Sequence, residues 1–464
     1  MAIHKILCLG DLHLGVRPSR LPAAVAPEVA SVAAVWRRAV DLALEEGVGL
    51  VLLSGDVVDR ANRYFEGFGR LEEGVRRLTE NGVEVCAVAG NHDFDVLPRL
   101  VEAVGGERCR LLGTGGSWQR WSWQEPRGEV LLHVDGWSFP GKNVREDPVA
   151  RYDLAPPGDD APLLGLVHGD LGQPASTNAP LARASLERAG PAAWLLGHVH
   201  KPELFELAGG RWALYPGSPQ PLDPTEEGPH GAWLLELEAG RLGRPRQVPL
   251  ATVRWETVEV DLSGARDLEE CQDRLAVRAR NAARETFEAD RSDLSHLVLK
   301  ARLVGRTQAH RRLAGLARAL MEETLLDFDV GGGRAALGQV RVATRPPIDL
   351  RRLATADDSP GLLAGLLLAL EGEAGAGATE APLPALVDLR AGVQERVRAV
   401  YDHRPYLPVR AQDEPEEDPG GGDGRERLAR VASDLLDALL AQKETRPELE
   451  APGERHPRSS AEAR

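Results

Sequence analysis

The chain has 464 residues, of which 42% are hydrophobic and 27% charged, and its formal net charge at pH 7 is −15. At roughly 100 to 200 residues per domain, this length predicts two to four domains and excludes a peptide hormone or a small stapled module. The negative charge argues against a general nucleic-acid coat, because nonspecific affinity comes from Lys and Arg that neutralise phosphates. Any nucleic-acid contact must therefore be a local patch, a metal centre or a partner's surface.

The cysteines and the hydropathy pattern indicate where in the cell the protein is expected. The four cysteines are widely scattered, and no two have the spacing of a metal site or a redox motif. The N-terminal apolar stretch is too short for a secretory signal, and the longest one elsewhere, residues 362–370, is about half the length that spans a bilayer. We therefore expect reduced thiols in a soluble, cytoplasmic protein.

In the first part of the chain, residues 1–250, short apolar runs alternate with amphipathic stretches. This pattern is typical of strands interleaved with helices, and it predicts one α/β domain. Helical spacing occurs at residues 33–44 and 71–78. Buried strands are expected at residues 5–9, 48–53, 83–89, 163–167 and 194–196.

The pattern restarts near residue 253 and predicts a compact second α/β domain over residues 251–346. The order of predicted elements in it is strand, helix, strand, helix and strand. Beyond it, residues 347–464 are rich in Gly, Ala and Pro and form a C-terminal extension. Linkers are expected there at residues 372–384 and 413–424, and helices near 386–400 and 425–442.

Five apolar runs of the first domain end in glycine next to Asp, Asn or His. The five segments are Gly10-Asp11-Leu12-His13, Gly55-Asp56, Gly90-Asn91-His92-Asp93, His168-Gly169-Asp170 and Gly197-His198-Val199-His200. In an open α/β sheet, ligands bind just beyond the C-terminal ends of the strands. Five strands could therefore deliver these side chains to one crevice, with glycine permitting the sharp turns.

The residue types in these segments indicate metal chemistry. Asp, Asn and His together suit two divalent transition-metal ions better than Ca²⁺ or a thiolate-bound Zn²⁺. Two ions roughly 3.5 to 4 Å apart, sharing one carboxylate, can hold a hydroxide and clamp both oxygens of an in-line phosphoryl displacement. Two carboxylates, two such ions and a hydroxide leave a net positive charge, which favours an anionic phosphate ester.

Taken in order, the motifs are recognisable. GDLHLG (10–15), GDVVD (55–59), GNHD (90–93), HGD (168–170) and GHVH (197–200) resemble the signature of calcineurin-like metallophosphoesterases. Within that superfamily, GHVHKPE (197–203), YPGSPQP (215–221) and the second α/β domain are similar to SbcD-type DNA repair exonucleases, including the YhaO-like branch. The resemblance implies a four-layer αββα sandwich with a smaller α/β cap and a helical C-terminal extension.

The resemblance also implies a role for each motif residue. Seven residues would hold two metal ions: Asp11, His13 and His200 the first, Asn91, His168 and His198 the second, and Asp56 both. His92 would be the catalytic group that protonates the leaving oxygen or steadies the transition state. Asp59 and Asp93 would orient ligands or nearby backbone. The family implies Mn²⁺ as the metal.

These features predict a metal-dependent DNA exonuclease of the SbcD type that hydrolyses phosphodiester bonds in DNA repair. One alternative is a phosphodiesterase or phosphatase acting on small nucleotides or phosphoproteins. Ser/Thr phosphatases resemble this chain less, because they tend to carry the motif GNHE where this chain has GNHD, ending in Asp93. A cap of nearly 100 residues also favours a polymeric substrate over a small metabolite. A non-catalytic scaffold is the second alternative, but it would require lost ligands, and every expected position is filled.

Three contacts with other molecules are expected. The resemblance implies a coiled-coil ATPase of the SbcC type as partner and dimerisation through the nuclease domain. An apolar stripe in the last predicted helix would dock on that ATPase; it comprises Leu428, Val431, Ala432, Leu435 and Leu439, widened by Leu436 and Leu440. Four arginines of the cap could contact DNA phosphates or form a solvated face: Arg302, Arg306, Arg311 and Arg312.

Overall fold

The computed structural model falls into two units, Met1–Pro346 and Pro347–Arg464. The residues that it describes are 3–22, 25–59, 64–104, 106–290, 292, 294–322, 327–371, 432–433, 435–436 and 439–440. The predicted helix at 386–400 and both predicted linkers lie outside these residues.

Two sheets face each other in the first unit. The first sheet runs in the order β14 (Arg241–Leu242), β13 (Gly231–Glu238), β1 (Ile3–Leu9), β2 (Leu50–Leu53), β3 (Glu84–Ala87) and β4 (Cys109–Leu111), with β15 (Arg246–Pro249) also paired to β13. Strands β1 to β4 are parallel, and β13 pairs with β1 in the antiparallel direction. The C-terminal ends of β1, β2 and β3 therefore meet at one edge of this sheet.

The second sheet has the same arrangement at its centre. Its order is β11 (Glu203–Leu207), β12 (Arg211–Tyr215), β10 (Ala193–Gly197), β7 (Leu163–His168), β6 (Val130–Trp137) and β5 (Gln119–Gln124). Strands β12, β10, β7 and β6 are parallel, so β7 and β10 also end side by side. A small pair, β8 (Asp170–Leu171) and β9 (Pro180–Leu181), follows β7.

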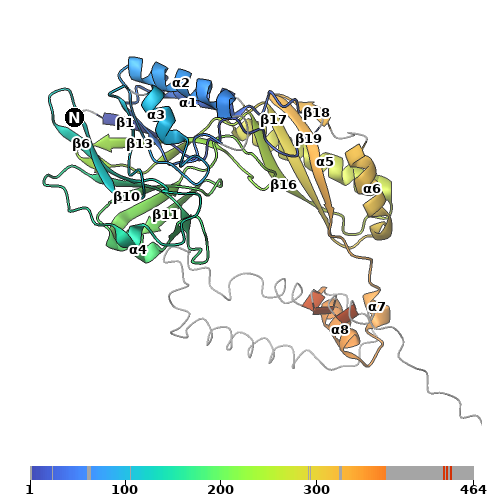
Figure 1. Cartoon of the computed structure of the whole chain (residues 1–464). Coiled ribbons are helices and arrows are strands. Elements are labelled where there is room, and N and C mark those ends of the chain that lie inside the picture. The colour runs from blue at the N-terminus through green and yellow to red at the C-terminus, as the bar shows by residue number, and fades with distance from the viewer. Residues whose placement is uncertain are drawn as a thin grey trace, which may run out of the picture. The chain divides into compact units, whose positions relative to one another are not determined.

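The two sheets and their helices form four layers (Figure 1). The central strands are buried on both faces: on β1, Ile6 and Cys8 point into the core between the sheets, while Leu7 and Leu9 belong to the core under the helices. Helices α1 (Val32–Glu45), α2 (Tyr64–Glu80) and α3 (Leu97–Val104) cover the first sheet, and α4 (Arg183–Arg188) with the short η1 (Val149–Arg151) covers the second. The predicted αββα sandwich is confirmed, and all four cysteines lie buried as free thiols.

The cap is a four-stranded sheet with two helices on one face. The sheet runs β16 (Val253–Asp261), β17 (His296–Val304), β19 (Gly333–Val342) and β18 (Asp327–Val330), and the helices are α5 (Leu268–Ala289) and α6 (His310–Glu322). The predicted strand and helix order is present, with β18 in addition. Only four residues long and carrying two aspartates, β18 has too little apolar pattern to be recognised in the sequence.

The opposite face of the cap sheet packs on the loop that follows β1. Val253, Trp255 and Val298 form a buried cluster with Val25 and Ala30, which lie between β1 and α1. Trp255 is almost fully buried. The cap is therefore joined to the αββα sandwich by an apolar contact as well as by the covalent chain.

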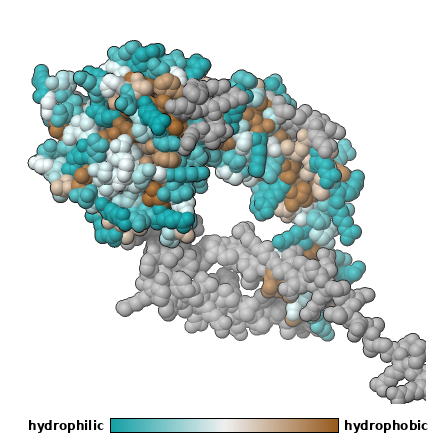
Figure 2. Space-filling model, viewed as in Figure 1, coloured by the Kyte–Doolittle hydropathy of each residue, from teal (hydrophilic) through white to brown (hydrophobic). Residues whose placement is uncertain are grey.

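The second unit contains two helices, α7 (Leu350–Leu353) and α8 (Ser359–Glu371), that the sequence analysis did not predict. The second of them is apolar on all sides, so it lacks the one-sided period by which helices are recognised. Leu367 of α8 packs against Ala432 and Leu436, which are helical in the segment predicted at 425–442. Within the described residues, no helix is both long and apolar enough to cross a bilayer. On the face shown in Figure 2, hydrophobic residues appear in small groups among hydrophilic ones.

Candidate metal centre

Every motif residue lies at or just beyond the C-terminal end of a parallel strand. Asp11 and His13 follow β1, Asp56 follows β2, and Asn91 with His92 follows β3. His168 ends β7 in the facing sheet, and His198 with His200 follows β10. The two sheets thus deliver all eight predicted site residues to one place.

The backbone at this place is strained. Seven non-glycine residues in the described part of the chain have a positive φ, and four of them are Asp11, His13, Asp56 and His198, at 49°, 47°, 49° and 99°. Such a conformation is costly for residues with a Cβ and tends to persist at functional sites. The loops hold one another: the His13 amide donates to the carbonyl of Asp56 over 2.9 Å.

Two glycines allow the loops to approach closely. A Cβ on Gly90 would lie 2.2 Å from Oδ1 of Asp56, and a Cβ on Gly197 would lie 2.0 Å from the carbonyl oxygen of Ser54. Neither space admits a side chain. Glycine at these motif positions is therefore required by packing between the loops as well as by the turns.

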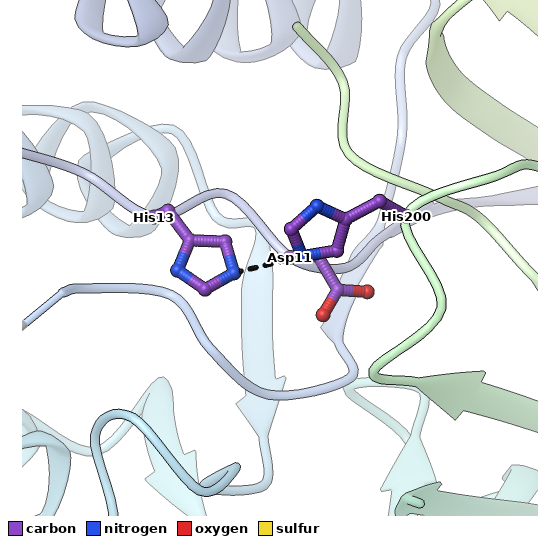
Figure 3. A group of neighbouring side chains, drawn as sticks. All are labelled: Asp11, His13 and His200. Atoms are coloured by element: carbon purple, nitrogen blue, oxygen red, sulfur yellow. Dashed lines mark hydrogen bonds between the residues drawn. The ribbon is translucent and has the colours of Figure 1, made fainter. Parts of the chain in front are cut away.

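The first group of potential ligands comprises Asp11, His13 and His200, whose candidate atoms all lie within 4.8 Å of one another. Figure 3 shows the two imidazoles facing each other, with their Nε2 atoms 3.1 Å apart. The Nδ1 atom of His200 lies 2.9 Å from a carboxylate oxygen of Glu226 and must donate to it. A neutral His200 therefore turns a bare lone pair toward His13, and either the Nε2–H of His13 or a cation must lie between the rings.

The second group comprises Asp56, His168 and His198. The Nδ1 atom of His168 lies 3.0 Å from the carbonyl oxygen of Ser54, so this nitrogen carries the hydrogen. Its Nε2 atom faces two oxygens, Oδ1 of Asn91 at 3.1 Å and Oδ2 of Asp56 at 3.3 Å. All three atoms are acceptors when the ring is neutral, so this gap too requires a proton or a cation.

A third group joins His92 to the site. Its Nδ1 atom lies 3.3 Å from Oδ2 of Asp59, and the same oxygen lies 3.6 Å from Nδ1 of His13. The His92 side chain is 45% exposed, whereas His13 and Asp59 are buried. His92 is thus the most exposed member of this group and is open to an incoming substrate.

Asp93 fixes the backbone of two site loops. Its carboxylate accepts hydrogen bonds from the amides of Val57 and Gly90, each over 2.7 Å. One buried carboxylate therefore ties the loop after β2 to the loop after β3. This contact keeps Asp56 beside His92, whose amide donates to Oδ1 of Asp56 over 2.9 Å.

Burial and neighbouring charges shift the pKa values of the ionisable groups in both directions. Burial lowers the pKa of His168, but the carboxylates of Asp56 and Asp11 outweigh it and raise this pKa to about 9. Burial opposes ionisation of Asp56 as well, yet His168 and His13 hold its pKa well below the usual range. His198 behaves oppositely, because burial and the charge of His168 lower its pKa to about 4. Protons occupy places here that a divalent cation would fill.

Sequence reasoning missed three residues that contact the histidines. Glu226 and Ser218 form a hydrogen-bonded chain with His200. The side-chain Nδ2 atom of Asn178 lies 3.4 Å from Nε2 of His198. Ser218 stands in the YPGSPQP segment, which the sequence analysis noted for another reason. Glu226 and Asn178 lie in loops with no recognisable motif, so only the folded structure brings them to the site.

Comparison with known protein families identifies the domain that carries this site. Residues 4–202 match the calcineurin-like phosphoesterases, and residues 255–345 match the middle domain of the metallophosphoesterase YhaO. The first domain is a calcineurin-like phosphoesterase. The predicted superfamily and its YhaO-like branch are therefore confirmed, and the matched region contains every predicted site residue.

Three relatives are similar to this chain. It is 28% identical over 283 residues to the uncharacterized metallophosphoesterase YhaO of Bacillus subtilis, covering 56% of this chain and 63% of that protein. It is 26% identical over 288 residues to the DNA double-strand break repair protein Mre11 of Methanopyrus kandleri (58% and 61%) and 25% identical over 367 residues to Mre11 of Aeropyrum pernix (75% and 87%). The chain spans less than two thirds of the first two relatives.

Proposed function

We propose that this phosphoesterase is a metal-dependent DNA exonuclease that acts in DNA repair. The observation that carries the proposal is the pair of gaps into which neutral His168 and His200 turn their lone pairs, one facing Asn91 and Asp56 and the other facing His13. In a purely structural site, two such gaps lined by carboxylates would only destabilise the fold. Two divalent cations would fill both and satisfy every acceptor around them.

The residues divide between the two ions as follows. Asp11, His13 and His200 would hold one ion, while Asn91, His168 and His198 would hold the other. Asp56 would contribute to both, because its Oδ2 atom lies 3.3 Å from Nε2 of His168 and 3.8 Å from Nε2 of His13. When bound, the ions supply an activated water and positive charge that stabilises the phosphoryl transition state. We propose Mn²⁺ from the family resemblance; the carboxylate and amide oxygens of Asp11, Asp56 and Asn91 are donors that suit this ion.

His92 acts on the substrate rather than on the ions. Its Nδ1 atom is engaged by Asp59, so its Nε2 atom remains to donate a proton to the leaving oxygen. Asp59 sets the direction of the ring. This places a general acid beside the ions on the exposed side of the site.

DNA is proposed as the substrate on two grounds. The two Mre11 relatives are named as DNA double-strand break repair proteins, and the YhaO-like middle domain forms a cap beside the site. Arg311 and Arg312 are exposed on α6 of this cap, whereas Arg302 pairs with Glu259 and Arg306 donates to the carbonyl of Pro346. Arg311 and Arg312 are the two arginines that we assign to DNA phosphates.

A coiled-coil ATPase of the SbcC type is proposed as partner of the second unit. The predicted apolar stripe is not wholly available to it, because Ala432 and Leu436 are buried against Leu367 of α8. The expectation that the whole stripe docks on the ATPase is therefore corrected. Leu435 is 51% exposed and Leu362 of α8 is 75% exposed, and we propose that the partner covers these two side chains. Dimerisation through the nuclease domain stays a prediction.

One assay separates the proposed function from its alternatives. Purified protein with Mn²⁺ is given end-labelled single-stranded or double-stranded DNA, and in parallel the small diester bis-p-nitrophenyl phosphate. Stepwise shortening of DNA from an end supports the exonuclease. Cleavage of the small diester alone would favour a phosphodiesterase of small nucleotides, and metal binding without cleavage of either substrate would favour a scaffold.

A further inference from the structure

The loop between β12 and β13 carries two adjacent glutamates with opposite connections. Glu226 contacts His200 of the metal centre, and Glu227 contacts the cap. We propose that Glu226 is a positioning residue that directs the His200 ring toward Asp11, and that the cap holds Glu226 in place through Glu227. This inference rests on the proposed function, in which His200 is a metal ligand.

Glu226 is buried, and donors fix both of its carboxylate oxygens. Its Oε1 atom lies 2.9 Å from Nδ1 of His200, while Oε2 accepts from the hydroxyl of Ser218 over 2.5 Å and from the amide of Leu222 over 3.0 Å. A carboxylate held by three donors has little freedom to turn. It therefore sets the tautomer of His200 and the direction in which Nε2 points.

The backbone of His200 is held by the same segment. The amide of Ser218 donates to the carbonyl of His200 over 2.9 Å. A Cβ on Gly217 would lie 2.4 Å from that carbonyl, so the turn before Ser218 packs directly against it. Both ends of His200, ring and backbone, thus depend on residues 217–226.

Two strands of the cap hold the next residue of the loop. Glu227 accepts from the hydroxyl of Thr257 in β16 over 2.9 Å and forms an ion pair with Lys300 of β17. Lys300 also donates to the carbonyl of Pro224 over 2.7 Å, and the amide of Gly228 donates to the carbonyl of Trp255 over 3.0 Å. The loop therefore moves with the cap, and a shift of the cap displaces Glu226 and changes the hold on His200.

The test measures metal binding to the full-length chain stripped of metal. Titration calorimetry with Mn²⁺ gives the dissociation constant of each ion without substrate, and thermal melting reports folding. Removing a carboxylate that orients a ligating histidine typically weakens metal binding about 10- to 100-fold. We expect a loss of this size for one ion in Glu226→Ala, and a smaller loss in Glu226→Gln, whose amide oxygen still accepts from Nδ1.

The link to the cap is tested in the same titration. Lys300→Met removes the ion pair with Glu227 and should weaken the same ion, by less than Glu226→Ala does. The matched control is Arg302→Met, which breaks the exposed pair with Glu259 across the same two strands and should leave both dissociation constants unchanged. An effect of Arg302→Met equal to that of Lys300→Met would overturn the assignment of this link.

The outcomes also separate this inference from the proposed function. Unchanged Mn²⁺ binding in Glu226→Ala, with wild type cleaving DNA, overturns the positioning role and leaves the function intact. If wild type binds two ions without cleaving DNA while Glu226→Ala loses one ion, the function fails and the positioning role stands. If Glu226→Ala melts far below wild type, the Glu226→Gln variant decides. If folded Glu226→Gln binds Mn²⁺ as weakly as Glu226→Ala does, the retained side-chain oxygen does not rescue binding, and the positioning role is overturned.

Discussion

At the scale of single residues, the ring orientation of the histidines carries most of the chemical information. His168 and His200 each donate from Nδ1 to a fixed oxygen, of Ser54 and of Glu226. The chain thereby fixes which nitrogen of each ring keeps its hydrogen when an ion binds. Such preorganisation lowers the conformational cost of binding a metal ion.

The roles of Asp56 and His92 can be separated by substitution. Asp56→Asn should reduce metal occupancy and turnover together, because the bridging carboxylate loses its charge. His92→Ala should keep both ions and lose turnover by about 10²- to 10⁴-fold, the usual contribution of a general acid. Metal analysis of the purified variants beside their DNA cleavage rates checks this. Loss of both ions from His92→Ala would contradict its assignment to the substrate.

Metal affinity should depend on pH. In the metal-free protein the pKa of His168 is raised to about 9, and the pKa of His200 is also raised to about 9, because Glu226 and Asp11 outweigh the effect of burial. Each ring must release its proton when a cation binds, so Mn²⁺ should bind more tightly as pH rises from 6.5 to 9. Calorimetry in buffers of different ionisation enthalpy measures the protons released. An affinity that stays constant over this range would refute the competition.

The same pKa values predict the opposite trend for the metal-free fold. A group whose pKa is raised by folding stabilises the native state fully below its unfolded pKa, near 6.5 for histidine, and this contribution disappears as pH passes the folded pKa. The melting temperature of the metal-free protein should therefore fall between pH 6.5 and 9. With Mn²⁺ present the fall should be smaller, because the ions replace the protons.

At the scale of the elements, what could be predicted follows from how each element is buried. Strand β2 (Leu50–Leu53) is buried on both faces and reads as an unbroken apolar run, so its sequence reveals it. Helix α8 is also apolar throughout, but its run is interrupted by glycine and lies in a region rich in Gly and Ala. Without a one-sided pattern it was assigned to no element.

The candidate site divides in the same way. Residues that follow strands in compact motifs, such as Asp11 and His168, could be found because the motif and the turn lie in one short segment. Glu226 could not, because its partner His200 is 26 residues away and the contact exists only after β12 and β13 have paired with different sheets. Sequence patterns of short range cannot contain such a contact.

A single methyl group at Gly197 should disrupt the site. In Gly197→Ala the new Cβ would lie 2.0 Å from the carbonyl oxygen of Ser54, which belongs to the backbone and cannot turn away. We expect a loss of stability of about 1–3 kcal/mol, typical of overpacking, together with weaker Mn²⁺ binding. Gly69→Ala in α2 is the control, since nothing lies within 4 Å of its Cβ. Denaturant melts and calorimetry would reveal the difference, and equal stability of the two variants would count against this packing.

Two neighbouring leucines of the extension should behave differently. Leu436 is buried against α8, so Leu436→Asp should loosen this packing and lower the melting temperature of the second unit. Leu435 is exposed, so Leu435→Asp should leave folding unchanged and weaken binding of the proposed ATPase partner at least tenfold, because burial of a leucine contributes about 1.5–3 kcal/mol. Titration of both variants with the ATPase tests this. Normal binding by a folded Leu435→Asp would place the interface elsewhere.

At the scale of the whole molecule, the proposed function requires an acidic chain to bind an acidic polymer. The net charge of −15 repels DNA at long range, so contact depends on the metal centre and on local basic residues. The exposed Arg311 and Arg312 on α6 of the cap can supply local positive charge of this kind.

Reversing charge on the cap should therefore affect long and short substrates differently. Arg311→Glu with Arg312→Glu should weaken binding of duplex DNA and make the affinity less dependent on salt, by about 0.9 in the logarithmic slope for each phosphate that is no longer neutralised. Cleavage of bis-p-nitrophenyl phosphate should be unchanged. The control is Arg302→Glu, since Arg302 is already paired with Glu259. Equal loss of activity on both substrates would show that these arginines act through the fold.

The pairing of β1 with β13 has a consequence for synthesis of the chain. β1 is a central strand of the first sheet, yet the partner on one of its edges, Gly231–Glu238, leaves the ribosome more than 220 residues later. Until then the apolar edge of β1 has no native neighbour, and it is open to pairing with other nascent chains. The histidines at 198 and 200 also emerge before this edge is closed. All the metal-binding loops are thus synthesised before the first sheet can close. During this stage of translation, chaperones would protect the unpaired edge of β1.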